Sequence, residues 1–376
     1  MILHDHVNTA GPRDSSPSSL VSRFSLPDTD KPQFCVAPMM GVTHHAFRHF
    51  LRLMSRRAWL VTEMIVARAV LERGADEYVR HDRGQSPILL QLGTGEPCEG
   101  AQAAKRACRL TPYDGININA GCPSSRVQGG HFGACLMHEP ARVAAIVRAV
   151  ADAVGRPVSV KCRLGLDDNP GEEDLDRFVE TLVEAGCATL FVHARNAWLQ
   201  GLDPRRNRSL PPLRWERVFR LKEKFPNLTV VLNGGITDLE SGQTLLENVD
   251  GVMLGRAVDS RPEILADVDR LFYGDCASER SSGRDLLDRY AEYVVAQSEE
   301  GVPASLLYAP LLRLGYGCRG ARRWRQTVVG EVSRLGRNPG EGFVSASLER
   351  LRALWTTLVP QEAGDGGEPV EGLRAC

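Results

Sequence analysis

The chain has 376 residues, of which 43% are hydrophobic and 25% are charged, and its formal net charge is -1. This composition predicts a globular protein with one large core and room for a smaller domain beside it. The near-zero net charge excludes a general electrostatic attraction to nucleic acid, so any such partner must be bound by a local basic patch.

Residues 1–32 mix charges with a Ser/Pro-rich run and are predicted to be a disordered N-terminal extension. The chain has no apolar run long enough for a membrane span, and its first residues lack the apolar stretch of a secretory signal. Its ten cysteines contain no C-x-x-C pair. They indicate buried or reactive thiols in a reducing compartment rather than a disulfide framework, and the expected location is the cytoplasm.

Residues 33–275 alternate short β-rich runs with longer amphipathic stretches, the pattern of repeated β/α units. The segment Arg142–Ala153, for example, places Val143, Ile146 and Val150 on one helical stripe. An open doubly wound sheet would carry an early G-x-G-x-x-G turn, which this sequence lacks. The prediction is therefore an α/β fold, a closed (β/α)8 TIM barrel. Its eight strands are expected at Phe34–Ala37, Trp59–Thr62, Ile88–Leu92, Gly115–Asn119, Val158–Cys162, Thr189–His193, Thr229–Asn233 and Gly251–Gly255.

The strand rhythm stops near residue 276. Helical patterns with glycine and proline punctuation then run to residue 360. Residues 276–360 are therefore predicted to form a smaller all-α helical domain. A Gly/Glu-rich flexible tail is expected over residues 361–376.

Each predicted barrel strand ends in polar, ionisable or glycine residues. One such residue would more often be structural, but eight exits of this kind together favour an active site, which in this fold lies at the C-terminal ends of the strands. The exits are Pro38-Met39-Met40, Thr62-Glu63-Met64, Gln91-Leu92-Gly93, Asn119-Ala120-Gly121-Cys122-Pro123, Lys161-Cys162-Arg163, His193-Ala194-Arg195, Asn233-Gly234-Gly235 and Gly255-Arg256.

The exits of the last two strands predict a phosphate site. The two exits are Asn233-Gly234-Gly235 and Gly255-Arg256. Glycine lets backbone N–H groups approach phosphate oxygens, and the arginine adds a fork of donors. This fold commonly binds phosphate after its last two strands, so the pattern indicates a phosphorylated cofactor.

Other exits suit the flat ring of such a cofactor. Lys161 and Gln91 are candidates for its polar edge, because an ammonium there stabilises an anionic reduced flavin. His193 could serve the ring edge or the phosphate, and Pro38-Met39-Met40 would pack against the ring face. The alternative for Lys161 is a structural lysine paired with a carboxylate.

Cys122 lies in a Gly-Cys-Pro turn directly after the fourth predicted strand. A thiol is mostly protonated near neutral pH, so it can act as a general acid on a carbon centre. The competing role is a nucleophile, which would need an adjacent base or a helix N-terminus. Cys135, among small and apolar residues, is predicted to be buried.

These motifs resemble the tRNA-dihydrouridine synthases over roughly residues 33–335. The resemblance includes the strand exits above, the run Val127-Gln128-Gly129-Gly130-His131-Phe132-Gly133-Ala134-Cys135-Leu136-Met137 and Lys161-Cys162-Arg163-Leu164-Gly165. The run from Ala194 to Leu202, with Asn207-Arg208 and Pro211-Pro212-Leu213, is similar to the bacterial A-type subgroup.

The resemblance implies an FMN enzyme that reduces uridine to 5,6-dihydrouridine in the D-loop of tRNA, at positions 20 and 20a, with NADPH as reductant. It implies that hydride passes from the flavin to C6 of the base and that Cys122 protonates C5. Asn119 and Arg195 would face the uracil. FMN would be held by Pro38, Met39, Met40, Gln91, Lys161, His193, Asn233, Gly234, Gly235, Gly255 and Arg256.

A basic segment supports an RNA substrate. Between residues 313 and 337 there are seven arginines and a single acid, Glu331, with Trp324 among them. Arg322 and Arg325 are three apart and would share a helix face that clamps the RNA backbone. Arg205 and Arg208 would add charge beside the active site. The alternative for the basic run is a solvated helix face.

Two other functions fit parts of the pattern. A small-molecule flavin reductase of the dihydropyrimidine or dihydroorotate dehydrogenase type would share the phosphate site and the lysine, without needing the basic helical domain. An RNA-binding protein that kept the barrel and lost the chemistry would not need Cys122, Lys161 and His193 together.

Overall fold

The computed structural model describes residues 33–72, 75–168, 172–275, 282–336 and 341–358. Nine parallel strands form one sheet, which closes because β2 pairs with both β1 and β4. The barrel strands are β1 (Phe34–Val36), β2 (Trp59–Val61), β4 (Ile88–Gly93), β5 (Gly115–Ala120), β6 (Val158–Arg163), β7 (Thr189–His193), β8 (Thr229–Asn233) and β9 (Gly251–Leu254). All eight predicted strands and the closed (β/α)8 barrel are confirmed.

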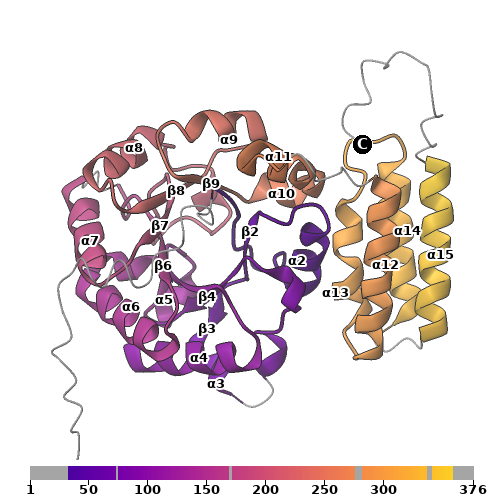
Figure 1. The fold of residues 1–376 in the computed structure, drawn as a ribbon, viewed down its shortest axis with the longest axis horizontal. Coiled ribbons are helices and arrows are strands. Elements are labelled where there is room, and N and C mark those ends of the chain that lie inside the picture. Colours follow the sequence, from indigo (N-terminus) through magenta and orange to yellow (C-terminus); the bar gives the residue numbers. More distant parts are fainter. Residues whose placement is uncertain (1–32, 73–74, 169–171, 276–281, 337–340, 359–376) are drawn as a thin grey trace, which may run out of the picture.

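The additional strand β3 (Ile65–Val66) extends the pairing along the end of β4. Helices surround the strands and cover their outer faces (Figure 1). They are α2 (His45–Arg52), α3 (Ala67–Leu71), α4 (Pro97–Leu110), α5 (Ser125–Gly129), α6 (Pro140–Val154), α7 (Glu172–Glu184), α8 (Trp215–Lys224), α9 (Leu239–Leu245), α10 (Arg256–Ser260) and α11 (Val268–Tyr273). Short 3-10 turns η4 (Gly133–His138), η5 (Arg206–Arg208) and η6 (Pro262–Asp267) lie on the connecting loops.

The helix expected at Arg142–Ala153 is confirmed as α6. It begins with Pro140, whose fixed φ suits the first turn, and ends at Gly155, which adopts a left-handed φ of 62°. Its Val143, Ile146 and Val150 are buried against the outside of the barrel. The helical period of the sequence thus defines the face that packs on the strands.

Two large apolar cores stabilise the barrel, and a third, small cluster contains Ala134, Leu166 and Ala197. The larger core fills the space between strands and helices and continues into the C-terminal helices. The smaller core is made by strand residues alone and fills the barrel interior; its members are Cys35, Ala37, Trp59, Val61, Leu89, Phe191, Val231 and Met253. The interior is therefore packed with side chains rather than open.

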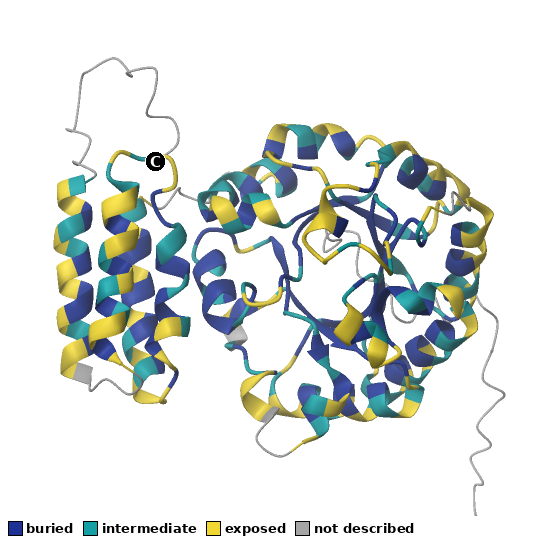
Figure 2. Cartoon of the chain, turned by 180° about the vertical axis from the view of Figure 1, so that it is seen from behind, coloured by how far each residue is buried: buried dark blue, intermediate teal, exposed yellow. Residues whose placement is uncertain are grey.

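A helical bundle follows the barrel and lies beside α2 (Figure 1). It consists of α12 (Gly283–Glu299), α13 (Ala304–Tyr308), a 3-10 turn η7 (Pro310–Arg313), α14 (Ala321–Leu335) and α15 (Glu341–Leu358). Figure 2 shows buried residues on the facing sides of these helices and exposed residues outside. Trp324 and Trp355 meet edge to face, with ring centroids 5.1 Å apart, at the centre of the bundle.

Aromatic and polar contacts join the bundle to the barrel across α2. The ring of His49 stacks on that of Tyr293 with centroids 3.8 Å apart, and Phe50 meets Tyr290 edge to face at 5.0 Å. His45 shares a 2.8 Å hydrogen bond with the Tyr293 hydroxyl. Burial lowers the pKa of His45 to about 4, so its imidazole is neutral at ordinary pH. The seam is thus a well-packed interface.

Seven cysteines of the described ranges are free thiols, which agrees with the sequence interpretation. Cys318 is the exception, because it is disulfide-bonded. The predicted N-terminal extension and C-terminal tail lie outside the described residues. None of the described helices combines the length and apolar character that a bilayer crossing requires.

Candidate active site

The inward face of each strand can be identified from the interior core. Side chains two residues apart lie on the same face of a strand. Leu89, Phe191 and Val231 point into the barrel, so the residues two positions later also point inward, at the C-terminal end. These are Gln91, His193 and Asn233. The strand exits predicted from sequence therefore converge on one mouth.

A ladder of buried amides crosses the mouth from β4 to β6. Gln91, fully buried, donates to the side-chain oxygen of Asn117 at 2.7 Å and accepts from Asn119 at 2.9 Å. Asn117 in turn donates to Ser159 at 2.9 Å. This network fixes the orientation of each amide. The sequence interpretation included Gln91 and Asn119 but missed Asn117.

Asn119 positions the turn that carries Cys122. Its side-chain oxygen accepts the backbone N–H groups of Gly121 at 3.1 Å and Cys122 at 3.0 Å. The Cys122 carbonyl accepts the N–H of Ala134 at 2.9 Å, so the turn is held from both sides. The Cys122 thiol is half-buried and free. No described residue forms a hydrogen bond with the Cys122 thiol, and Lys161 and Arg163 are the nearby charged groups.

Arg163 also holds the turn that carries Cys122. The sequence interpretation did not include it among the site residues. Its guanidinium is buried and donates to the carbonyls of Gly121 at 3.1 Å and Asn207 at 3.0 Å. It therefore ties the Cys122 turn to the loop after β7. Burial lowers the pKa of Arg163 to about 10, which leaves it charged.

Lys161 lies at the centre of the mouth, one strand from Asn119. Its ammonium donates to the side-chain oxygen of Asn233 at 3.0 Å, and the Asn233 amide donates to the carbonyl of Met253 at 2.7 Å. A paired carboxylate, the structural alternative for Lys161, is not found among its described partners. Burial, followed by repulsion from Arg163, lowers the pKa of Lys161 to about 7.

The two glycine exits form a close backbone cradle. Gly234 has a φ of 106°, and a Cβ there would lie 2.6 Å from the His193 ring. Gly235 has a φ of 80°, and a Cβ there would lie 2.4 Å from Leu213. Both conformations favour glycine. Gly255 precedes Arg256, the first residue of α10, beside Met39.

Several cations surround this cradle. Burial, then the nearby cations Arg163, Lys161, Arg195 and Arg256 in that order, lower the pKa of His193 well below its usual value. Burial and Arg256 likewise lower the pKa of Arg195. Repulsion of this kind is relieved when an anion binds. The glycine cradle and these donors therefore fit a phosphate and the polar edge of a flavin, as FMN requires.

Arg195, Arg205 and Arg208 lie on the loop side of the mouth. Arg195 donates to the carbonyl of Pro211, and its buried Nε has no hydrogen-bond partner. Such a buried donor is available to a ligand. Arg205 and Arg208 are exposed beside η5, and the Arg208 carbonyl accepts from Arg256 at 3.2 Å.

The loop after β1 contributes an apolar wall. Met39 is buried, Pro38 is half-buried and Met40 is 67% exposed. The Glu63 carboxylate accepts the backbone N–H of Gly41 and so holds this loop. An exposed methionine costs free energy in water and suits a surface that a flat ring covers.

Arg322 and Arg325 lie on α14, in the bundle rather than at the mouth. Both are exposed, and neither forms an ion pair with any residue in the described ranges. Trp324 between them is buried, with its indole N–H donating to the carbonyl of Leu311 at 2.6 Å. Trp324, the aromatic residue within the basic run, therefore belongs to the core of the bundle.

Cys135 is half-buried in η4 and donates to the carbonyl of Phe132 at 3.2 Å. It is therefore less buried than the sequence predicts. Burial raises its pKa, so its thiol stays protonated.

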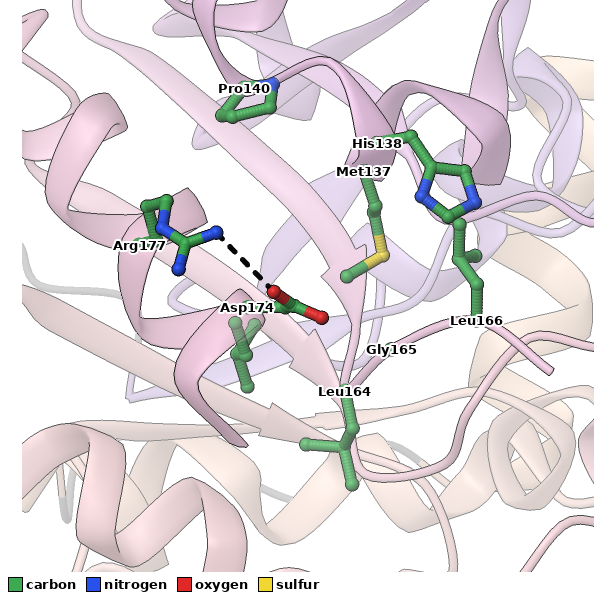
Figure 3. Close-up of a pocket in the computed structure, with 9 residues that line it drawn as sticks. Met137, His138, Pro140, Leu164, Gly165, Leu166, Asp174 and Arg177 are labelled. Carbon is green, nitrogen blue, oxygen red and sulfur yellow. Dashed lines mark hydrogen bonds and ion pairs between the residues drawn. The ribbon is translucent and has the colours of Figure 1, made fainter. Parts of the chain in front are cut away.

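A pocket of about 150 Å³ lies between the segments that follow β5 and β6 (Figure 3). It is lined by Met137, His138, Pro140, Leu164, Gly165, Leu166, Asp174, Leu175 and Arg177. The volume is below the roughly 300 to 1,000 Å³ that ligand sites usually occupy. None of its lining residues belongs to the predicted site.

Comparisons with known proteins agree with this geometry. The model of the family described as Dihydrouridine synthase (Dus) matches residues 35–336. A tRNA-dihydrouridine(20/20a) synthase of Pseudomonas putida is 43% identical over 312 residues, covering 82% of this chain and 92% of that protein.

Proteins of the same name from Synechocystis and Escherichia coli are also similar. The first is 44% identical, covering 78% of this chain and 87% of the relative. The second is 41% identical, covering 81% of this chain and 88% of the relative. A solved structure of morphinone reductase with tetrahydroNAD has a TM-score of 0.44 and 14% identity, covering 68% of this chain and 90% of that one. That similarity is too weak to inform on function.

Proposed function

Since the chain belongs to the dihydrouridine synthase family, we propose that it reduces uridine to 5,6-dihydrouridine in the D-loop of tRNA, at positions 20 and 20a, with FMN as cofactor and NADPH as reductant. Its curated relatives carry the name of this activity and are matched over most of their length. The observation that carries the proposal for this chain is the half-buried thiol of Cys122, fixed at the same mouth as the cation cradle.

Different residues of the mouth would bind different parts of FMN. Gly234, Gly235 and Gly255 would let backbone N–H groups approach the phosphate of FMN, and Arg256 and His193 would lie around it. Lys161, whose direction is fixed by Asn233, would bind the polar edge of the ring. Gln91 presents an oriented amide, and Pro38 to Met40 cover the ring face. When bound, the flavin supplies the hydride that C6 of the uracil receives.

Cys122 completes the reduction by donating its proton to C5 of the uracil. Asn119 and Arg163 hold the peptide of Cys122, so the thiol does not have to reorganise during the transfer. The thiolate that remains takes a proton from water before the next turnover. Asn119 and Arg195 face the base, and the unpaired Nε of Arg195 is a donor for its carbonyl oxygen.

The exposed arginines support binding of the RNA. A uridine in folded tRNA must be drawn out of its stack before it can reach a barrel mouth. Arg205 and Arg208 lie beside the mouth, and Arg322 and Arg325 are exposed on α14 of the bundle. These four side chains contact phosphates and so hold the RNA while the base is extruded.

The direct test supplies FMN, NADPH and an unmodified tRNA transcript to the purified chain and measures dihydrouridine by mass spectrometry. Free uracil and orotate serve as competing substrates. We expect a mass increase of two hydrogens per modified uridine, confined to the D-loop. Rapid flavin re-oxidation by uracil or orotate, with no change in the tRNA, would instead identify a small-molecule reductase. Protein that binds tRNA but no flavin would contradict the enzymatic role.

A further inference from the structure

The loop that leads from η7 into α14 has a defined shape. A hydrogen bond of 3.1 Å joins Cys318 N–H to the Gly315 carbonyl, and another of 3.1 Å joins Ala321 N–H to the Cys318 carbonyl. Gly315, Gly317 and Gly320 all have positive φ, at 72°, 80° and 93°. Two successive tight turns therefore fold the chain between Gly315 and Ala321, named here the Tyr316 loop.

The underside of the Tyr316 loop packs on the bundle. A Cβ on Gly315 would lie 3.1 Å from the Trp355 ring, and a Cβ on Gly320 would lie 2.6 Å from Leu358. A side chain would be tightly packed at either position, and the positive φ of both residues also favours glycine. Tyr316, between two of the glycines, is 51% exposed, and its hydroxyl has no hydrogen bond to a described residue. The loop therefore presents an aromatic ring to the surface.

The Tyr316 loop is also fixed to the barrel. The backbone N–H of Gly315 donates to the Glu263 carboxylate on η6 at 3.0 Å. Two residues earlier, Arg313 pairs with Asp259 of α10 at 2.6 Å and lies over the Phe47 ring. Since α10 begins at Arg256 of the cofactor cradle, these contacts set the position of Tyr316 relative to the mouth.

Most of the arginines that follow Tyr316 in the sequence are exposed. Of the seven arginines of the basic run, Arg313 pairs with Asp259 and Arg334 with Glu331, while Arg337 lies outside the described residues. The remaining four, Arg319, Arg322, Arg323 and Arg325, are exposed and have no partner within the described ranges. All four lie within the nine residues that follow Tyr316.

We propose that the Tyr316 loop is a second nucleobase site, where an unpaired base of the RNA stacks on Tyr316 while its flanking phosphates contact Arg319 and Arg322. An exposed ring beside unpaired arginines is the combination that binds single-stranded RNA. The inference rests on the proposed function, because it names a further contact of the same tRNA, distinct from the uridine that reacts.

The test measures tRNA affinity by fluorescence anisotropy over a range of salt for three variants of the FMN-loaded chain. Tyr316→Ala should weaken binding roughly 5- to 100-fold, the range known for loss of one base stack. Tyr316→Phe should bind like the parent, since the ring is kept. Tyr78→Ala, which removes a tyrosine that is 66% exposed on the barrel, should have no effect.

The salt dependence separates stacking from charge. Tyr316→Ala should leave the slope of log affinity against log salt unchanged, because stacking releases no counterions. Arg322→Ala should reduce that slope by about 0.7 to 0.9. Equal affinity of Tyr316→Ala and the parent would overturn the inference, as would an equal loss in Tyr316→Phe. Equal weakening by Tyr316→Ala of a fully paired RNA duplex would also overturn it.

Binding and turnover distinguish this inference from the proposed function. At saturating tRNA, Tyr316→Ala should form dihydrouridine at the parental rate, so KM rises and kcat does not. A parent that binds tRNA through Tyr316 but forms no dihydrouridine would contradict the activity and leave the stacking site standing. A parent that forms dihydrouridine, together with a Tyr316→Ala variant of unchanged tRNA affinity, would support the activity and contradict the stacking site.

Discussion

The cations of the barrel mouth and those of α14 carry the same charge in opposite physical settings. At the mouth, Lys161 and Arg163 are held by hydrogen bonds, and burial lowers the pKa of each. On α14, Arg322 and Arg325 are exposed and unpaired. Fixed, desolvated cations suit one anion of defined shape. Mobile, solvated arginines suit a phosphate backbone whose position varies, with an affinity that salt controls.

The largest effect should come from the chemistry at the mouth. Cys122→Ser should reduce dihydrouridine formation by about 10² to 10⁴, the usual contribution of a general acid. FMN absorbance and tRNA affinity should remain parental, because the Cys122 turn is held by its backbone. The matched control is Cys135→Ser, another half-buried thiol near the mouth. Turnover of Cys122→Ser at the parental rate would remove the acid role.

The second-largest effect should be a weaker binding of FMN when the ammonium group of Lys161 is removed. Lys161→Met removes a charged hydrogen-bond donor, which is worth about 1.5 to 3 kcal/mol, or roughly 10- to 100-fold in FMN affinity. The change can be followed by quenching of flavin fluorescence on binding. Lys105→Met, at an exposed lysine of α4, should bind FMN like the parent. An unchanged affinity in Lys161→Met would place the flavin elsewhere.

The same lysine should make FMN binding depend on pH. The pKa of Lys161 is about 7 before binding, and the negative charge of bound FMN raises it. Binding therefore takes up a proton. Affinity should be constant below about pH 7 and fall with rising pH above it, by up to about tenfold per pH unit. Calorimetry in buffers of different ionisation enthalpy would detect the proton. Lys161→Met should lose this dependence.

The smallest effect should come from the exposed arginines. Arg322→Ala with Arg325→Ala should weaken tRNA binding several-fold at about 0.1 M salt and flatten the salt slope by about 1.4 to 1.8. FMN affinity and the free energy of unfolding should change little, by less than about 0.5 kcal/mol. Arg334→Ala, whose partner is Glu331, should leave tRNA binding intact. An equal flattening in Arg334→Ala would erase the distinction between paired and unpaired arginines.

The sequence predicted the barrel well because each strand carries a local pattern. The strands are short apolar runs with a polar exit, and the period-two alternation places Gln91, His193 and Asn233 inside. The strand Ile65–Val66 was missed because two residues carry no pattern. Such a short strand forms only through its neighbour β4.

Residues that act through distant partners could not be read from the chain. Arg163 is two residues after Lys161 in the sequence, but its role depends on the carbonyls of residues 121 and 207. Trp324 sits among arginines, and only the bundle shows that it is buried. The exposed aromatic of that region, Tyr316, lies between glycines that signal a turn but give no direction for the ring.

The seam along α2 limits how this chain can be divided or recombined. One face of that helix belongs to the barrel, and its histidines and Phe50 receive the tyrosines of α12. A shortened chain that stops after α11 would expose this aromatic surface to solvent, and such a protein would be prone to self-association. A chimera that takes the helical bundle from a relative must therefore take α2 from the same relative, so that the contacts between α2 and α12 are kept.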